Sequence, residues 1–352
     1  MKSKCGLENR VEREIAQLLD AVLHHPEFQR LEATWCGIRT LVEAVSHADQ
    51  GTASAGDSEI TEAAGVLISL LDVSKAELTD DVNSGRLRNT ALFDKVYQQG
   101  YNTFGGIPFG VIVGDFEFLD NQNEISLLSD ISSIVSASFS VFVTAVGPAF
   151  FHIDQFRDLC SIIDLGRRVP VDITARFQDQ RSGWQTLRGR REARFLALAL
   201  PRMLMRRPYD YRRGLGSAAE GAGERDSDKL MSFCYRETVK ADGSTHLWGS
   251  AAYGLAIVAA QCFIRTGWLA DIHGVAGDGE GAGISWRRPE DEDLFETDRH
   301  RNVFKPATDV VIPDLLEKEL ASLGFLTLTH RHGSPVAAFC STPSVYLSLI
   351  HI

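Results

Sequence analysis

The chain has 352 residues, of which 44% are hydrophobic and 24% charged, and a formal net charge of −11. This composition excludes a largely disordered chain, and the length allows two or three domains or one large α/β unit. The excess of acidic residues argues against a general nucleic-acid binder, which needs clustered Lys and Arg for phosphate contacts.

The six cysteines are scattered along the chain and form no C-x-x-C pair. A chain of this size needs no disulfide staples, so buried reduced thiols are expected. The first residues contain no apolar stretch of the kind found in a secretory signal, and the longest apolar runs are too short to span a bilayer. We therefore expect a cytoplasmic protein with no membrane partner.

Two amphipathic helices are expected at the start of the chain. The first is predicted over Leu7–Leu23, where apolar residues recur at steps of three and four. The second is predicted to begin at Pro26, a residue suited to the first helical turn, and to continue through Val45. Two such helices in succession indicate an αα-hairpin.

Strands and helices are predicted to alternate after a Gly-, Ala- and Ser-rich linker at residues 50–57. The expected strands are Val66–Leu71, Gly110–Phe116, Val141–Val146, Phe195–Leu200, Trp268–His273 and Phe325–Thr329. The expected helices are one capped by Ser74 and Glu77, then Ala91–Gln98, Glu124–Ser138, Ile153–Cys160, Trp248–Thr266 and Leu315–Leu323. Residues 215–228 and 274–298 are expected to be loops.

This alternation predicts an α/β fold: a mixed, mostly parallel sheet flanked by helices and preceded by the N-terminal αα-hairpin. We expect four regions, namely a helical hairpin at 1–49, a first α/β region at 58–213, a second at 229–340 and a short tail at 341–352.

Sequence motifs for catalysis are scarce. The chain contains no P-loop, no G-x-S-x-G nucleophile elbow, no H-E-x-x-H and no zinc-ligand spacing, and Gly277–Gly283 resembles a dinucleotide loop only superficially. His330 and His332 could share one strand face, but no third ligand stands nearby, so we expect neither cofactor nor metal. Asp115 follows an apolar strand, where α/β enzymes keep catalytic groups, and an enzyme using it is one alternative.

The window Arg176–Arg213 contains eleven arginines and no lysine. A nucleic-acid surface is one interpretation, but aromatics are sparse there and a predicted strand interrupts the window. Arginine also forms bidentate ion pairs at interfaces, which we consider the better interpretation. The acidic run Glu290–Asp298 on another copy is a candidate partner for Arg190, Arg191 and Arg194, whose charge reversal should then weaken self-association.

Several ordered motifs together resemble one family. Ala91–Tyr97, Thr103–Gly110 and Gly114–Phe118 are similar to the signature block of the large sheath subunit of the bacterial type VI secretion system (TssC, VipB or ImpC). Further matches in the same order bring the similarity to nearly the whole chain. The residues that carry it include Phe28, Trp35, Phe93, Tyr97, Phe104, Gly105, Gly106, Pro108, Gly110, Gly114, Asp115, Pro201, Arg202, Trp248 and Gly249.

The resemblance implies a structural subunit rather than an enzyme. The family's large subunit pairs with a small subunit (TssB or VipA) and polymerises with further copies of itself around an inner tube of Hcp. Contraction of this sheath expels the tube, and the ATPase ClpV later disassembles the sheath. Energy storage in such a polymer requires a bistable interface.

The sequence also departs from the family pattern at both ends, where members usually carry more residues. A fragment, a truncated paralogue that caps or regulates assembly, and a specialised subunit are therefore all expected alternatives. The terminal segments of the family interlock neighbouring subunits by strand exchange, so the sequence leaves open whether this chain locks into a full sheath.

Overall fold

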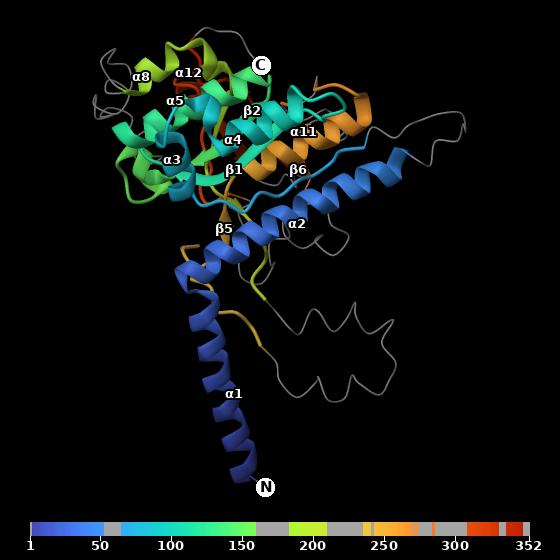
Figure 1. Cartoon of the computed structure of the whole chain (residues 1–352). Coiled ribbons are helices and arrows are strands. Elements are labelled where there is room, and N and C mark those ends of the chain that lie inside the picture. The colour runs from blue at the N-terminus through green and yellow to red at the C-terminus, as the bar shows by residue number, and fades with distance from the viewer. Residues whose placement is uncertain are drawn as a thin grey trace. The chain divides into compact units, whose positions relative to one another are not determined.

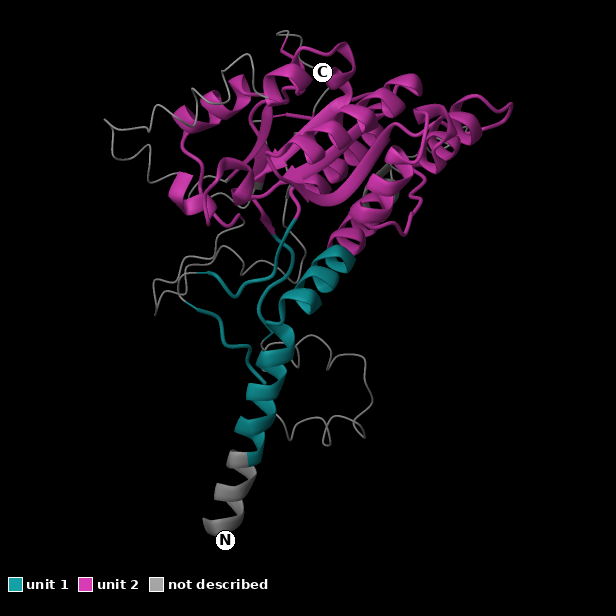
Figure 2. Ribbon diagram, turned by 60° about the vertical axis from the view of Figure 1, so that its left-hand side comes forward, with its two compact units in different colours: residues 1–36, 204–249 teal, residues 37–203, 250–352 magenta. Residues whose placement is uncertain are grey.

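A computed structural model describes residues 2–52, 65–159, 183–209, 235–240, 243–269, 272–273, 284–285, 308–330 and 336–347. The chain divides into two compact units (Figure 2). Residues 1–36 and 204–249 form unit 1, and residues 37–203 and 250–352 form unit 2. The expected loop at 215–228, most of the expected loop at 274–298 and the linker residues 53–57 lie outside the described residues. Two of these predictions were partly wrong, because Ile284 and Ser285 form a strand within the second loop and linker residues 50–52 are helical.

Unit 1 contains the N-terminal helices predicted from the sequence. Helix α1 (Lys2–Leu23) is followed after two residues by α2 (Pro26–Thr52), which begins at the expected proline and continues into unit 2. The predicted helical hairpin is thus confirmed. The second part of unit 1 leads from β4 (Met203–Leu204) to β5 (Trp248–Gly249), and the N–H of Met205 donates to the carbonyl of Leu247 at 2.9 Å.

Unit 2 is built on a six-stranded sheet with the order β1-β2-β3-β7-β8-β6. Strands β1 (Val111–Phe118), β2 (Val141–Val146), β3 (Leu196–Leu200) and β7 (Phe325–His330) are parallel. Strand β8 (Val336–Phe339) runs antiparallel to both β7 and the edge strand β6 (Ile284–Ser285). The mixed, mostly parallel α/β fold is therefore confirmed. Strands from both predicted α/β regions share this sheet, and the predicted region boundaries stay a prediction.

Helices cover both faces of the sheet (Figure 1). Helix α11 (Ala252–Thr266) packs against β1, β2 and β3, whereas α5 (Gln122–Ala137) packs against β2 and α12 (Asp314–Ser322) against β7. Shorter helices complete this unit: α3 (Lys75–Asn83), η1 (Leu87–Asn89), α4 (Ala91–Phe93), η2 (Asp94–Tyr101), η3 (Pro148–Phe151), α8 (Gly183–Arg188) and η4 (Arg191–Phe195). The capping box predicted at Ser74 and Glu77 is present at the start of α3.

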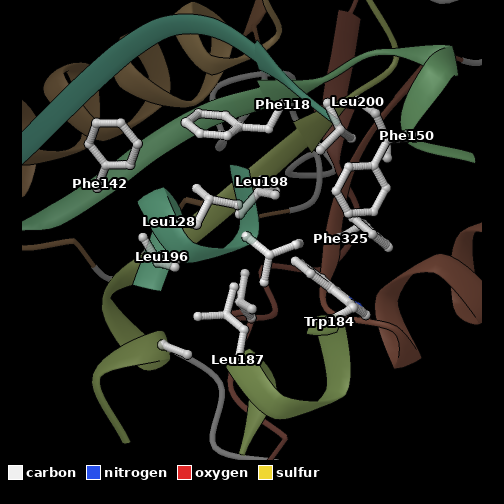
Figure 3. Packing of buried hydrophobic residues seen from close by; sticks show 14 of the residues in the cluster. Phe118, Leu128, Phe142, Phe150, Trp184, Leu187, Leu196, Leu198, Leu200 and Phe325 are labelled. Carbon is white, nitrogen blue, oxygen red and sulfur yellow. The ribbon is translucent and has the colours of Figure 1, made fainter. Parts of the chain in front are cut away.

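The core of unit 2 lies between the sheet and the α5, α8 and α12 helices (Figure 3). The rings of Trp184 and Phe325 stack with centroids 4.9 Å apart, and Phe150 meets Trp184 edge-on at 5.4 Å. The indole N–H of Trp184 donates to the carbonyl of Leu323 at 3.1 Å, which satisfies the polar group of a fully buried ring. This packing fixes β7 beside α8, two elements far apart in the sequence.

Several predicted elements differ in the structure. The helix predicted at Ile153–Cys160 is helical only from residue 156 in the described part of the chain. Residues 65–74 form no strand, and Leu67, Leu70 and Leu71 are 72%, 63% and 51% exposed. Trp268 and Leu269 lie in an exposed bend rather than a strand. Both predictions were wrong for one reason: an apolar run indicates burial but does not supply the neighbouring strand that a sheet requires. The predicted helix from Trp248 begins only at Ala252, because Trp248 and Gly249 form β5.

Candidate functional site

The signature block begins in a well-anchored helix. Phe93 is buried, and its N–H donates to the side chain of Thr90, which caps α4. The carboxylate of Asp81 accepts the N–H groups of Ala91 and the following residue at 2.9 and 3.2 Å. The ring of Tyr97 lies 4.9 Å from that of Phe93. The first part of the block therefore belongs to the folded core.

The Gly-Gly-x-Pro loop that follows lies at the surface. Phe104 is fully exposed and Ile107 is 68% exposed, as are Pro108 and Gly110 to a lesser degree. Gly105 has a φ of +79°, a conformation that favours glycine. A Cβ on Gly106 would lie 2.6 Å from the carbonyl oxygen of Gln99, so this position also requires glycine. The loop geometry is thus fixed by its backbone, while its apolar side chains contact solvent.

A series of aromatic rings connects this block to two other segments. The ring of Tyr101 lies 5.8 Å from Tyr97 and 6.1 Å from Phe139, which in turn lies 6.2 Å from Phe195. Phe139 is 65% exposed and has a φ of +58°. We call Tyr101, Phe104, Ile107 and Phe139 the aromatic patch. It lies where β1, β2 and β3 begin. The sequence analysis did not identify Phe139, because nothing in the sequence signals an exposed ring at this turn.

The opposite ends of the same strands carry charged side chains. The hydroxyl of Tyr253 on α11 donates to Asp115 Oδ2 at 3.2 Å. Arg202, which follows β3, forms a bidentate pair with Glu117 on β1, with N···O distances of 2.6 and 2.7 Å. A Cβ on Gly114 would collide with the ring of Phe142, so the strand approaches its neighbour closely there. Asp115, expected after the strand, thus lies within β1, and both Asp115 and Glu117 are engaged by other side chains.

Asp309 joins this group from a distant part of the chain. Thr308 forms a bridge with Met203, and the N–H of Asp309 donates to the carbonyl of Arg202 at 3.1 Å. Burial raises the pKa of Asp309 to about 7, although Arg202 partly offsets the effect. Its Oδ1 is shielded from solvent and has no hydrogen-bond partner among the described residues. Thr308–Val310 is one of the segments that resemble the sheath family. Its contact with Arg202 has no local sequence signal, because Thr308 and Met203 lie more than a hundred positions apart.

The arginines of the rich window have separate roles. Arg188 is buried and donates to the carbonyls of Val345 and Ser322 at 3.1 and 2.9 Å. Burial lowers the pKa of its guanidinium. Arg190, Arg191 and Arg194 are exposed around η4. Among the described arginines of the window, Arg188 is thus used inside the fold, whereas these three face solvent.

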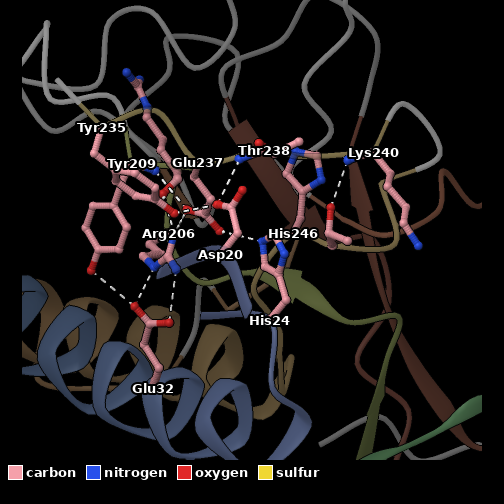
Figure 4. Close-up of polar contacts among 12 residues, drawn as sticks. Asp20, His24, Glu32, Arg206, Tyr209, Tyr235, Glu237, Thr238, Lys240 and His246 are labelled. Atoms are coloured by element: carbon pink, nitrogen blue, oxygen red, sulfur yellow. Dashed lines mark hydrogen bonds and ion pairs between the residues drawn. The ribbon is translucent and has the colours of Figure 1, made fainter. Parts of the chain in front are cut away.

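Unit 1 contains a charged network of its own (Figure 4). Arg206 donates to both carboxylate oxygens of Glu32 at 2.5 and 3.0 Å and to Glu237 at 2.6 Å. Glu237, whose side chain is 1% exposed, also accepts the N–H of Tyr209 at 2.9 Å and lies 3.2 Å from His24. The network links α1 and α2 to residues 204–209 and 235–240.

Ionisation in this network follows from its contacts. Burial would lower the pKa of Arg206, but hydrogen bonds to Glu32 and Glu237 raise it above its usual value. Burial would raise the pKa of Asp20, but hydrogen bonds from Tyr235 and Thr238 lower it. Both groups are therefore held in the charged form, and the network acts structurally by satisfying buried charges.

The remaining motif residues are dispersed. Phe28 and Trp35 on α2 are 38% and 59% exposed, whereas Pro201 is buried at the end of β3. Trp248 donates its indole N–H to the carbonyl of Gly243 at 2.9 Å. A Cβ on Gly249 would collide with Met205, which explains the glycine. These residues shape their own units and do not converge on one pocket.

Two findings concern ligands and membranes. Within the described ranges, no group of three His, Cys, Asp or Glu side chains is arranged to hold a metal ion. His330 ends β7, while His332 lies outside the described residues. No helix in the described part of the chain is both long and apolar enough to cross a bilayer.

Comparison with known proteins identifies the family. A family model described as VipB (EvpB/VC_A0108), tail sheath N-terminal domain, matches residues 8–346. The chain belongs to this sheath family. The type VI secretion system sheath protein TssC1 of Pseudomonas aeruginosa PAO1 is 28% identical over 332 residues, which are 93% of this chain. The chain spans 58% of the length of that curated relative.

The VipB match gives the site residues a common context. Family membership covers both units, including the aromatic patch, the paired charges at the other strand ends and the network of unit 1. The predicted resemblance to the large sheath subunit is therefore confirmed, and the family is one of structural sheath proteins.

Proposed function

We propose that this chain is a structural subunit of a type VI secretion contractile sheath. In this role it pairs with a small sheath subunit of the TssB or VipA kind and polymerises with further copies around an Hcp-like inner tube. A ClpV-like ATPase would disassemble the polymer. The observation that supports the proposal best is the sheath-family match over residues 8–346.

An exposed apolar stripe on α1 supports a protein partner. Val11, Ile15, Leu18 and Val22 are 49%, 41%, 68% and 54% exposed, although they share one helical face. Side chains at this spacing are typical of a helix that packs against another helix. We infer that the small subunit covers this stripe, since an unpaired stripe is unfavourable in water.

The extended segment before α3 supports the same proposal. Residues 66–71 have the length and apolar composition of a strand but pair with no strand in the described part of the chain, and Leu67, Leu70 and Leu71 are exposed. An exposed segment of this kind can add to the sheet edge of another chain. Leu67 and Leu70 would then become buried in the complex.

Co-expression with a small sheath subunit from the same genome tests the proposal. A stable complex that purifies as one species is expected, with tubules visible by electron microscopy. Leu18→Asp should reduce co-purification about tenfold or more, because it places a charge in the apolar contact. Gln17→Asp, on the same helix, adds the same charge outside the stripe and should have no effect. A chain that stays monomeric beside its partner would refute the proposal.

The second candidate function is capping or regulation of sheath assembly. The exposed apolar stripe on α1 would serve this function equally well, because a cap also has to bind a sheath subunit. Adding the protein to assembling full-length subunits separates the two roles. Incorporation along the tubules supports a building block, whereas shorter tubules with this chain only at their ends support a cap.

A further inference from the structure

The aromatic patch has the properties of a docking surface rather than of a folding core. Tyr101, Phe104, Ile107 and Phe139 are 44%, 106%, 68% and 65% exposed. The loop that carries Phe104 and Ile107 is nevertheless tied to the turn at Phe139, because the hydroxyl of Ser140 donates to the carbonyl of Phe109 at 2.7 Å. Exposed aromatics on a fixed backbone are typical of residues that anchor protein contacts.

The backbone conformation at Phe139 also indicates a binding role. A bulky residue with a φ of +58° is strained, and strain of this kind concentrates at functional sites. Asn or Gly would relieve the strain at an ordinary turn. The ring contributes little to the core, since it contacts Tyr101 and Phe195 from the solvent side. A role in binding accounts for an aromatic residue there.

Positive charge borders the patch. The guanidinium of Arg194 lies 4.9 Å above the ring of Phe195, which neighbours Phe139. Arg190 contacts Ser129 and Ser133 on α5 and lies 3.8 Å from Glu192, with both side chains of that pair largely exposed. With Arg191, three arginines stand here beside two acids, Glu192 and Asp130, so the rim carries a small excess of positive charge. A ligand for this surface should therefore combine acidic and apolar side chains.

The chain itself contains such a ligand. Residues Glu290–Asp298 carry six acids in nine positions, and Leu294 and Phe295 stand in the middle of them. This pattern complements an aromatic surface bordered by three arginines, because the acids can pair with the rim while the two apolar side chains cover the patch.

The topology of the sheet places the aromatic patch far from the residues that flank the acidic segment. The aromatic patch lies at the end of the sheet where the parallel strands β1, β2 and β3 begin. Ser285 ends β6, which runs in the direction of β7, and Thr308 pairs with Met203 just beyond β3. The described residues on either side of the acidic segment, Ser285 and Thr308, thus both lie at the opposite end of the sheet. A second copy stacked on the first would place these two residues near the patch.

We propose that the aromatic patch and Arg190, Arg191 and Arg194 bind the acidic segment 290–298 of a second copy. The proposed contact is head-to-tail, because the patch lies at one end of the sheet and the residues that flank the segment lie at the other. Head-to-tail contacts that do not close into a ring build open filaments. This inference rests on the proposed function, for which it names the surface between copies.

Photo-crosslinking tests the contact directly. A benzoylphenylalanine is placed at Phe104 in the full chain, co-expressed with the small subunit, and ¹⁴N- and ¹⁵N-labelled preparations are mixed before assembly. Crosslinked peptides should contain residues 290–298 and should be isotopically mixed, whereas the same probe at Trp268, another exposed ring, should give none. Crosslinks within one copy, crosslinks to the small subunit or no crosslinks would each overturn the proposal.

A charge swap provides an independent test. Arg190→Glu, Arg191→Glu and Arg194→Glu together should reduce the amount of pelleted polymer at least about tenfold. Changing Glu290, Asp291, Glu292 and Asp293 to lysine in the same chain should restore it. Polymer formation unaffected by the first change, or no recovery after the second, refutes the proposed contact. Co-purification with the small subunit should persist throughout, and its loss in the unaltered chain would instead refute the proposed function.

Discussion

The two ends of the parallel strands in unit 2 differ in what they offer to solvent. Where the strands begin, Phe104 and Phe139 are exposed although they are aromatic. Where the strands end, Glu117, Arg202 and Asp309 are charged yet contact one another. The charged end of such a sheet is where α/β enzymes bind ligands. Here Arg202 and Glu117 pair with each other, and the exposed aromatic rings lie at the other end.

This difference separates folding from assembly. Substitutions at the charged end should alter the stability of the isolated chain, while substitutions at the aromatic end should alter only what the chain binds. The following predictions run from the largest expected change in stability to the smallest.

The titration of Asp309 gives the largest expected effect. Its pKa is raised from 3.8 to about 7 by burial, so the stability it confers when protonated is lost as the pH rises from about 4 to about 7. Asp309→Asn cannot ionise and should therefore gain about 2 kcal/mol on the wild type between pH 5 and pH 8. Denaturant unfolding of both proteins at the two pH values measures this gain. A difference that does not depend on pH would show that Asp309 is solvated.

The second largest change in stability is expected when the positive charge of Arg202 is removed. Arg202→Met leaves Glu117 without its bidentate partner and Asp309 without its nearby positive charge. Loss of one partner from a fully buried pair costs about 3–5 kcal/mol. Since both side chains are more than a third exposed, solvent screening should reduce the loss to about 1–2 kcal/mol. Arg191→Met, at an exposed arginine, is the control and should leave the unfolding midpoint unchanged.

The hydrogen bond between Tyr253 and Asp115 allows the structural role of Asp115 to be tested. Tyr253→Phe removes the donor to Asp115 Oδ2 and should lower the free energy of unfolding by about 1 kcal/mol. Asp115→Asn should have an effect of similar size. If Asp115→Asn abolished a hydrolytic or transfer activity of the purified chain while leaving its stability unaltered, the enzymatic alternative would replace the structural one.

The smallest effect on folding is expected at the aromatic end. Phe104→Ser removes a fully exposed ring and should leave the unfolding midpoint of the isolated chain unchanged, although it should weaken polymer formation. Thermal unfolding and pelleting assays on the same preparation measure the two properties. Val96→Ser, on the buried side of the preceding helix, is the contrasting variant and should destabilise the chain. A clear loss of stability in Phe104→Ser would contradict the distinction between the two ends.

The fold could be predicted wherever the pattern was local and the element buried. Strand β2 has the predicted bounds because its apolar run is buried, and α3 begins at its predicted capping box. Residues 66–71 show the limit of this reasoning, because their hydrophobicity was evident but their missing partner strand was not. The helix predicted at Leu315–Leu323 is followed by Gly324, whose φ of +89° is the conformation that favours glycine after a helix.

The site could be predicted only in part. The position of Asp115 and Glu117 at a strand end followed from the strand itself. Their partners Tyr253 and Arg202 come from elements that only the tertiary fold brings near, and the contact of Arg206 with Glu32 spans 174 positions. Phe139 was missed because an exposed ring in a strained turn has no sequence pattern of its own.

The most direct test of the distinction between the two ends is side-chain footprinting of the chain before and after assembly. Hydroxyl radicals oxidise exposed aromatic rings, so the reactivity of Tyr101, Phe104 and Phe139 reports whether they are covered. We expect these three rings to be strongly protected from oxidation in the polymer. In the complex with the small subunit alone, they should stay as reactive as in the free chain. Rings that stay as reactive in the polymer as in the free chain would contradict the account.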